Sequence, residues 1–393
     1  MNRREFIRRA AAGVGALGVS LASARVVRPE PTLRIGYLPI TDAAPLLIAH
    51  GRGYYADEGL SVPQPVRVRS WSALSESFLT GKFNVVHMLL PIPVWMRYNN
   101  DVPVKVLAWD HTNGSAVTVR SDAGIEGFAD LGGRQIAVPY WYSMHNVILQ
   151  MGLEKAGVRP VIQRQSESLD ADQANLFVLP PPEMPVALFG KKIDAYIVAE
   201  PFNAVGEVKV GARIMRFTGD MWKNHPCCVI VMAESLVRSE PVFVQKVINA
   251  IVRAQAWATD NPEGAATLLS REGNGYLPTS EAVLKRVFTG YDLATYGGKT
   301  GPKAIRHPEW GMSRIGFQPY PYPSATRFIV SRMQSTLMEG DTAFLKDLDP
   351  DRVATDLVDE TFVKKAIDAV GGPGRFAPID LTRPWDREET IDI

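Results

Sequence analysis

The sequence predicts a two-lobed α/β fold in which each lobe is a mostly parallel sheet flanked by helices. Short apolar runs suited to buried strands alternate with segments suited to helices, a rhythm typical of parallel sheets. The 393 residues suffice for two domains of roughly 100–200 residues each. Short motifs rich in Pro, Ser and His recur where strands should end, and the carboxyl ends of parallel strands meet at one edge of a sheet. The motifs therefore predict one ligand pocket built from distant segments.

The chain is expected to cross twice between the lobes. A first segment, residues 32–119, builds most of lobe 1, and residues 120–218 build lobe 2. Residues 219–393 return to lobe 1 and add C-terminal helices and a tail rich in Pro and charged residues, which is expected to wrap that lobe.

Local signals place the elements of the first segment. Thr41 or Asp42 is expected to cap a helix that has Pro45 in its first turn, where a missing N–H costs little. Ser70 or Ser72 is expected to begin the next helix. Strands are predicted at residues 33–37, 66–68, 85–86 and 104–108.

Similar signals place the elements of lobe 2 and of the return. Gly157 is expected to end one helix, Pro262 to separate two others, and Gly371 with Gly372 to stop the last. Helices are predicted at residues 142–156, 182–189, 242–260 and 351–370, and strands at 135–139, 194–198 and 228–232.

Residues 1–24 resemble an export signal rather than a structural element. Paired arginines and Phe6 precede an apolar run over residues 10–21 and the small-residue sequence Ala22-Ser23-Ala24. An amphipathic first helix is the alternative. We expect a twin-arginine signal peptide, and hence a periplasmic protein that folds before export. No Cys follows the expected cleavage site, so no lipid anchor is expected.

The charge balance argues against a nucleic-acid partner. The formal net charge is +1, and the signal carries four Arg and one Glu, so the remainder carries about −2. No basic cluster follows the signal, whereas nucleic-acid binding needs a basic face. The two cysteines, Cys227 and Cys228, are adjacent and cannot form a long-range disulfide. By strand alternation, one thiol is expected to face the pocket and one the core.

The sequence contains no Gly-x-Ser-x-Gly, no His-Glu-x-x-His and no phosphate-binding loop, so no enzyme activity, cofactor or metal is expected. Two α/β lobes, two crossovers and an export signal indicate a periplasmic binding protein of the type II kind. Such proteins close by a hinge around a small polar or anionic solute. We expect a monomer.

Motifs in one order along residues 33–332 resemble the nitrate- and bicarbonate-binding receptors of ABC importers. These receptors belong to a wider family that also binds sulfonates, taurine and thiamine-pyrimidine precursors. The resemblance implies that this protein delivers its solute to an ABC permease in the inner membrane. The resemblance rests on the segment 36–46, Ser70-Trp71-Ser72-Ala73, His87-x-Leu-x-Pro-x-Pro, Pro180-Pro181-Pro182, Glu200-Pro201 and the segment 218–226.

The resemblance implies a pocket that differs from that of the nitrate receptors, which surround the anion with Trp, Gln, His and Lys. Trp71 and His145 match the Trp and the His, while Ser115 stands for the Gln and Cys228 for the Lys. Losing a charge-assisted partner costs roughly 1.5–3 kcal/mol. The ligand is therefore nitrate, a more neutral solute, or an anion held by His145 and its helix N-terminus.

Each candidate ligand-binding residue also has a structural interpretation. Trp71 could pack in the core, His87 could be a satisfied structural histidine, and His145 could cap its helix. Thr41 and Asp42 could act only as caps, and Glu200 could form a salt bridge that closes the lobes. We favour Ser115 as a contact and Asn113 as its support. The full candidate set is Thr41, Asp42, Trp71, His87, Asn113, Ser115, His145, Glu200 and Cys228.

Three alternative functions remain open. The first is a receptor for a sulfonate or a pyrimidine precursor. The second is an enzyme similar to the thiamine-pyrimidine synthases, which use pyridoxal phosphate on a related but cysteine-rich scaffold. The third is a sensor partner that presents ligand to a membrane kinase. A soft-metal site using Cys228, His145 or His225 has no ligand spacing to support it.

Overall fold

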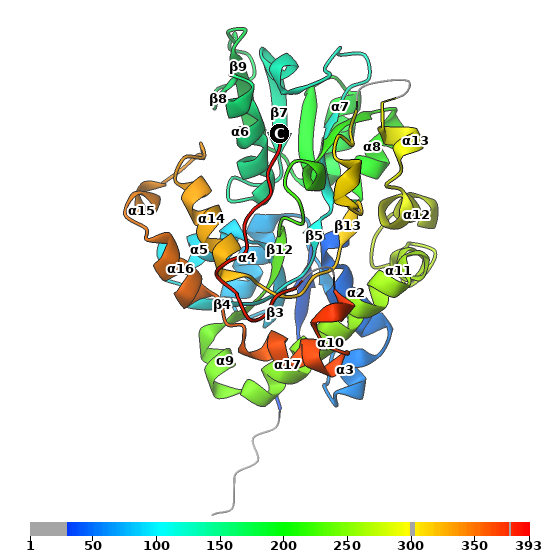
Figure 1. Cartoon of the computed structure of the whole chain (residues 1–393), viewed down its shortest axis with the longest axis vertical. Coiled ribbons are helices and arrows are strands. Elements are labelled where there is room, and N and C mark those ends of the chain that lie inside the picture. Colours follow the sequence, from blue (N-terminus) through cyan, green and yellow to red (C-terminus); the bar gives the residue numbers. More distant parts are fainter. Residues whose placement is uncertain (1–29, 299–302, 377–378) are drawn as a thin grey trace, which may run out of the picture. The chain divides into compact units, whose positions relative to one another are not determined.

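The computed structural model describes residues 30–298, 303–376 and 379–393 (Figure 1). Residues 32–393 form one compact unit. The predicted signal peptide, residues 1–24, lies outside the described residues. Within the described part of the chain, no helix is both long enough and apolar enough to cross a bilayer.

The first sheet holds five strands in the order β2-β1-β3-β12-β4. Strands β1, β2 and β3 pair in parallel, whereas β12 runs antiparallel to both β3 and β4. The chain thus leaves this sheet after β4 and returns through β12, as expected from the sequence. The bounds are β1 Ile35–Tyr37, β2 Val66–Arg67, β3 Val85–Leu89, β4 Val104–Trp109 and β12 Cys228–Ala233.

The second sheet holds six strands in the order β11-β6-β10-β7-β9-β8. Three of its pairings are parallel, and β6 runs antiparallel to β10 and β11. Because β6 begins at Ser115, the second sheet starts five residues before the lobe boundary expected at residue 120. The bounds are β6 Ser115–Val119, β7 Arg134–Val138, β8 Arg159–Val161, β9 Gln173–Val178, β10 Ala195–Ala199 and β11 Arg213–Phe217.

A two-stranded ribbon links distant parts of the chain: β5 Thr112–Asn113 pairs antiparallel with β13 Ile315–Gly316. Helices cover the sheets, which confirms the predicted α/β fold class. They are α2 Ala44–Gly51, α3 Tyr54–Asp57, α4 Trp71–Leu79, α5 Pro91–Tyr98, α6 Met144–Lys155, α7 Met184–Phe189, α8 Phe202–Val210, α9 Glu234–Ser239, α10 Pro241–Asp260, α11 Pro262–Leu269, α12 Glu281–Thr289, α13 Leu293–Tyr296, α14 Pro323–Met333, α15 Ala343–Lys346, α16 Pro350–Leu357 and α17 Thr361–Ala369.

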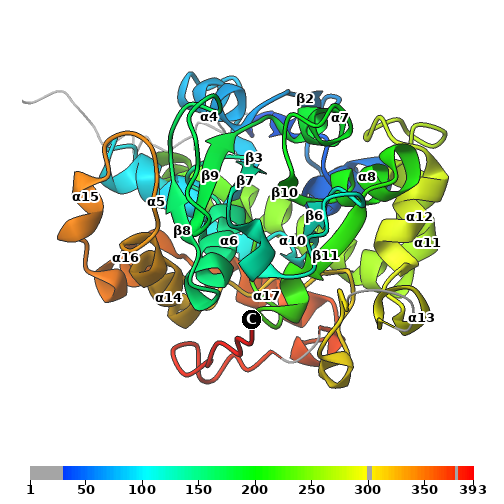
Figure 2. The same ribbon diagram turned by 90° about the horizontal axis from the view of Figure 1, so that it is seen from above.

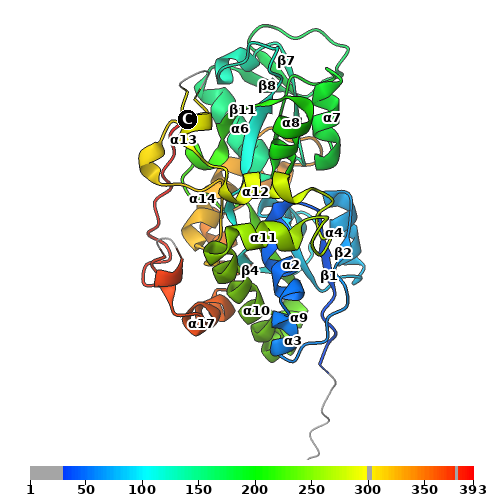
Figure 3. The same ribbon diagram turned by 90° about the vertical axis from the view of Figure 1, so that its right-hand side faces the viewer.

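Two groups of helices lie on opposite flanks. Helix α12 lies between α8 and α11 (Figure 3), while α5, α14 and α16 pack together on the other flank (Figure 2). Helix α12 therefore contacts a helix that packs on the second sheet, although it belongs to the segment expected to return to lobe 1. The division of the chain into two hinged lobes stays a prediction.

The capping predictions had mixed outcomes. The Ser70 hydroxyl accepts a hydrogen bond from the Ala73 amide at 3.2 Å, which confirms Ser70 as the cap of α4. Pro45 lies in the first turn of α2, as predicted. The expected cap by Thr41 or Asp42 was wrong, because both residues form a short 3-10 turn before α2 and neither side chain bonds the helix amides. The Thr41 hydroxyl instead donates to the carbonyl of Glu200.

The helix predicted over residues 351–370 is two helices, α16 and α17. Between them Val358 is extended and bridges Val106 of β4, and the Asp359 amide donates to the Val106 carbonyl at 2.9 Å. A tertiary backbone pairing therefore breaks a segment whose side-chain pattern suits one helix.

The tail contacts both sheets rather than wrapping lobe 1 alone. Arg387 lies 4.8 Å from the ring of Trp109 at the end of β4. Farther on, the Asp392 carboxylate pairs with Lys155 of α6 at 3.2 Å, and its carbonyl accepts from Arg216 of β11 at 3.3 Å.

Candidate functional site

One edge of the first sheet gathers two of the predicted residues, Asp42 and Cys228, with two that were not predicted, Asp110 and His111. Asp42 follows β1, the pair Asp110-His111 follows β4, and Cys228 begins the antiparallel strand β12. The carboxyl ends of β1 and β4 and the amino end of β12 therefore meet, as expected for parallel strands with one reversed neighbour. All of these side chains are fully buried.

Asp42 is the centre of this cluster. Its Oδ2 lies 3.0 Å from His111 Nε2, 3.2 Å from Cys228 Sγ and 3.7 Å from Cys227 Sγ. Burial alone would raise the pKa of Asp42, but His111 and the other nearby imidazoles lower it below its usual value. Burial likewise opposes the charge on His111, yet Asp42 raises the pKa of His111 well above 6.5. The two side chains therefore form a buried ion pair.

Both cysteine thiols lie on the Asp42 side, so the prediction that one faces the pocket and one the core was wrong. Strand alternation does not apply, because Cys227 precedes the first residue of β12. Both cysteines are free and buried. Burial raises the pKa of Cys228 well above that of an ordinary thiol, so its S–H donates to the Asp42 carboxylate.

Trp71 and His87 form an aromatic pair beside the cluster, with ring centroids 5.5 Å apart in an edge-on arrangement. The Leu38 amide donates to His87 Nε2 at 3.0 Å, and burial lowers the pKa of His87 to about 3. The neutral ring must therefore carry its proton on Nδ1. Neither this Nδ1–H nor the Trp71 Nε1–H has a partner among the described residues.

His145 supplies a third imidazole, one residue after the start of α6, where Ser143 is the helix cap. Its Nε2 lies 2.9 Å from Ser115 Oγ, and burial lowers its pKa to about 4. Its Nδ1 has no partner in the described structure. The structure thus brings together two of the predicted ligand-binding residues, Ser115 and His145.

Asn113 supports this region through its backbone. Its φ is +58°, a left-handed conformation that Asn tolerates, and its amide donates to the His225 carbonyl at 3.0 Å. A Cβ at Gly219 would lie 2.7 Å from the Asn113 side chain, so only glycine fits there. The Asn113 Oδ1 is buried and unpaired within the described residues.

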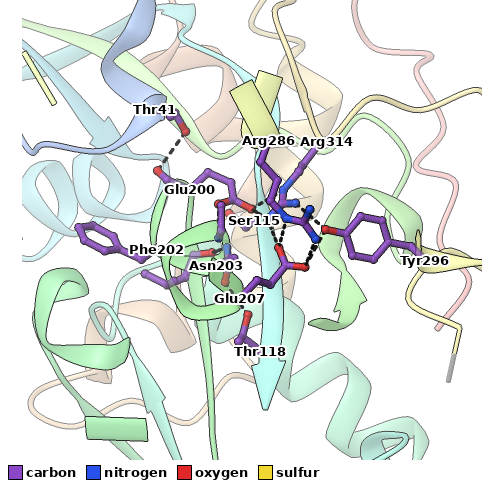
Figure 4. Close-up of polar contacts among 12 residues, drawn as sticks. Thr41, Ser115, Thr118, Glu200, Phe202, Asn203, Glu207, Arg286, Tyr296 and Arg314 are labelled. Atoms are coloured by element: carbon purple, nitrogen blue, oxygen red, sulfur yellow. Dashed lines mark hydrogen bonds and ion pairs between the residues drawn. The ribbon is translucent and has the colours of Figure 1, made fainter. Parts of the chain in front are cut away.

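Both carboxylate oxygens of Glu200 have protein partners, so neither is free to bind a ligand. Its Oε1 pairs with Arg314 at 2.6 Å, and its Oε2 accepts the Ala204 amide at 3.1 Å (Figure 4). Its carbonyl accepts both the amide and the hydroxyl of Thr41, at 2.8 and 3.0 Å. Glu200 therefore joins the segment after β1 to the segment after β10.

Arg314 extends this network outward. It donates to Glu207 at 3.1 Å and to the Tyr296 hydroxyl at 2.9 Å (Figure 4). Arg286 of α12 donates to the other carboxylate oxygen of Glu207 at 2.8 Å (Figure 4). All carboxylate oxygens of this network have partners. Arg314 was missed in the sequence because it lies in an irregular segment 114 residues after Glu200.

His111 and Asp110 were also missed, although a usable signal existed. They come one residue after the predicted strand at 104–108, and strand ends led to the other candidates. Burial raises the pKa of Asp110 well above its usual value, and both of its carboxyl oxygens are unpaired in the described structure.

A separate hollow of ≈ 510 Å³ lies beside the tail and contains none of the predicted site residues. Its walls carry charges of both signs. They include Trp109, Thr112, Lys223, Gln318, Tyr322, Asp380, Arg383, Arg387 and Glu388.

The chain matches the sequence profile of the NMT1-like family over residues 27–270. It is 29% identical over 262 residues to the nitrate/nitrite binding protein NrtA of a Nostoc species, which covers 62% of this chain and 57% of that protein. It is 21% identical to the bicarbonate-binding protein CmpA of a Synechococcus species, over 90% of this chain and 81% of that protein. Matches to the ATP-binding proteins NrtC and CmpC of Synechocystis span only 35% and 37% of their lengths.

Solved structures share the fold. The periplasmic nitrate-binding protein NrtA from Synechocystis aligns with a TM-score of 0.73 and 20% identity, covering 92% of this chain and 93% of that one. The alkanesulfonate-binding protein SsuA from Xanthomonas axonopodis aligns with a TM-score of 0.58 and 17% identity, covering 86% and 99%. Since the family profile covers more than half of the sequence, the chain belongs to the NMT1-like family.

Proposed function

We propose that this protein is the periplasmic solute-binding component of an ABC importer and that it captures a small oxyanion of the nitrate or bicarbonate class. Capture by hinge closure between the two sheets belongs to the same proposal. So does export by the twin-arginine route, which the sequence of residues 1–24 favours.

The observation that carries the proposal is a set of three buried ring nitrogens without partners: Trp71 Nε1, His87 Nδ1 and His145 Nδ1. A buried donor left unpaired costs about 1–3 kcal/mol. Two of these groups, the Trp71 indole and the neutral His87 ring, can only donate at these atoms. An oxyanion that accepts these hydrogen bonds would recover that cost.

The neighbouring side chains suit an anion despite the carboxylate of Asp42. His111 neutralises that carboxylate, so the Asp42–His111 ion pair carries no net charge. The Ser115 hydroxyl is held by His145 and would add a further polar contact. Thr41 and Asn113 position the surrounding backbone. Cys228 belongs to the same cluster because its thiol donates to the Asp42 carboxylate.

Similarity favours binding over catalysis and an importer as the partner. The nitrate/nitrite, bicarbonate and alkanesulfonate proteins that this chain resembles are named as binding proteins. Segments of the ATP-binding proteins NrtC and CmpC match it as well. We therefore propose a membrane ABC permease as the partner and a monomeric receptor.

The test is a thermal unfolding series on the reduced, metal-free mature protein with nitrate, nitrite, bicarbonate and ethanesulfonate. A ligand present at 100 times its Kd should add about 2.7 kcal/mol of stability. Trp71→Phe keeps an aromatic ring, although a smaller one, and removes the N–H. It should weaken binding of the stabilising anion roughly tenfold, since such a hydrogen bond contributes about 1.5 kcal/mol or more.

Trp141→Phe is the matched control, because the Trp141 indole donates to Glu339 instead, at 3.1 Å. The proposal fails if no anion stabilises the protein, or if both Trp variants weaken binding equally.

A further inference from the structure

Four side chains with metal-binding atoms converge at the edge of the first sheet. Asp42, His111, Cys227 and Cys228 each offer one atom, and these four atoms lie within 4.8 Å of one another. Three segments supply them: the turn after β1, the turn after β4 and the start of β12. All four residues are fully buried, so the sheet edge rather than a flexible surface fixes their positions.

The spacing of the donor atoms suits a four-coordinate ion. Bonds of about 2.0–2.3 Å place tetrahedral ligands about 3.3–3.8 Å apart. Asp42 Oδ2 lies 3.0 Å from His111 Nε2, 3.2 Å from Cys228 Sγ and 3.7 Å from Cys227 Sγ. The three distances from Asp42 therefore lie within a few tenths of an ångström of the tetrahedral range, and since all four donor atoms lie within 4.8 Å of one another, a shift of about 1 Å would bring the widest pair into it.

Several buried polar atoms beside the four donor atoms are unpaired. Asp42 Oδ1 and His111 Nδ1 are buried and have no partner among the described residues, as is also true of both oxygens of the adjacent Asp110. The hydrogen bonds within the cluster thus leave polar capacity unused. The two thiols are free rather than joined in a disulfide.

We propose that Asp42, His111, Cys227 and Cys228 bind one thiophilic transition-metal ion of the Zn²⁺ class. Two sulfurs and an imidazole select such an ion over Mg²⁺ or Ca²⁺, which prefer oxygen ligands. Binding replaces the thiol protons and the imidazole proton at Nε2, so these protons are released to solvent and affinity rises with pH. This set differs from the soft-metal candidates considered from the sequence, since His111 and Asp42 take the place of His145 and His225.

The metal site goes beyond the proposed solute site, because none of its four ligands is a ring that carries the anion proposal. His87 and His145 are near enough to Asp42 to influence its charge electrostatically, so a cation bound by Asp42 would lie beside both imidazoles. Its positive charge should then strengthen the binding of an anion at these rings.

Cobalt titration of the reduced, chelator-treated protein tests the site. Co²⁺ is the probe because its visible spectrum reports tetrahedral geometry and its near-ultraviolet bands report thiolate ligands. We expect one Co²⁺ per chain with both signatures, displaced by Zn²⁺. Cys227→Ser and Cys228→Ser should each weaken the thiolate bands and lower Co²⁺ affinity by more than about 100-fold, since even outer-shell changes cost about 10–100-fold.

Two controls separate this site from adventitious binding. His111→Gln should keep the thiolate bands but weaken affinity. His307→Asn, which alters a histidine beside Glu309 and Asp392, should change nothing. A wild-type spectrum without thiolate bands overturns the proposal whether or not the variants fold, and so does equal binding by a folded Cys227→Ser/Cys228→Ser double variant.

Anion titrations of the metal-free protein keep the two proposals distinguishable. Anion binding without a cobalt–thiolate spectrum overturns the metal site and leaves the solute proposal intact. If the protein gives the cobalt–thiolate spectrum but binds no anion, either metal-free or metal-loaded, the solute proposal alone is overturned.

Discussion

The molecule contains two buried polar networks that differ in how completely they are paired. In the network of Glu200, Glu207 and Arg314, all carboxylate oxygens have partners (Figure 4). In the Asp42 cluster and its surrounding rings, buried atoms of Asp42, Trp71, His87, Asp110, His111 and His145 are unpaired within the described residues.

Both networks carry buried charge, so burial alone does not distinguish a structural site from a binding site. An unpaired buried polar group costs free energy, whereas a fully paired network can rigidify the structure. We therefore propose that the Glu200 network holds the chain together, whereas the Asp42 cluster and its surrounding rings bind a ligand. Changes in the two networks should have opposite consequences for stability.

Arg314→Met should produce the largest effect. It leaves Glu200 and Glu207 buried without their shared partner, and breaking a buried pair costs about 3–5 kcal/mol. Urea unfolding at pH 7 measures the loss. Arg332→Met removes an ion pair to the exposed Glu154 and should cost less than about 1 kcal/mol. Equal losses in the two variants would remove the structural role from the Glu200 network.

His87→Gln should change the acid limb of the stability curve. The folded pKa of His87 is about 3, whereas an unfolded histidine titrates near 6.5. Between these values the unfolded state binds more protons, so the free energy of unfolding falls as pH falls, by about 1.4 kcal/mol per pH unit. The variant should lack this slope and gain about 2 kcal/mol relative to wild type between pH 8 and pH 5. Parallel curves over that range, from denaturant unfolding, would show that His87 is not held neutral.

Asp110→Val should raise the stability of the ligand-free protein by about 1 kcal/mol, because it removes two unpaired buried oxygens. Asn203→Leu should have the opposite sign. Its amide is paired with the Thr118 hydroxyl at 2.8 Å and the Val198 carbonyl at 2.7 Å, so its loss should cost about 1–3 kcal/mol. Differential scanning calorimetry of both variants measures the contrast. A loss of stability in Asp110→Val would mean that its oxygens are satisfied.

Local signals in the sequence were sufficient for the fold class and for the strand ends where candidate residues lie. The cap at Ser70 and the strand ends near Asp42 and Cys228 depend on residues close to predictable elements. The family resemblance stated from motifs is confirmed by the profile match.

The features that the sequence could not predict depend on long-range contacts. Arg314 reaches Glu200 across 114 residues, and Val358 breaks a helix by pairing with β4. The orientation of Cys227 depends on where β12 begins, which periodicity does not locate to one residue. The choice of ligand-binding residues stays a prediction.

Nuclear magnetic resonance of the ¹⁵N-labelled, metal-free protein would test most directly whether the unpaired cluster binds the solute. The ring nitrogens of Trp71, His87 and His145 would be followed during titration with nitrate, nitrite, bicarbonate or ethanesulfonate. We predict saturable shifts at all three for at least one anion, while the indole of Trp141 stays unchanged. Unchanged ring nitrogens with every anion, or shifts no larger than that of Trp141, would contradict the assignment.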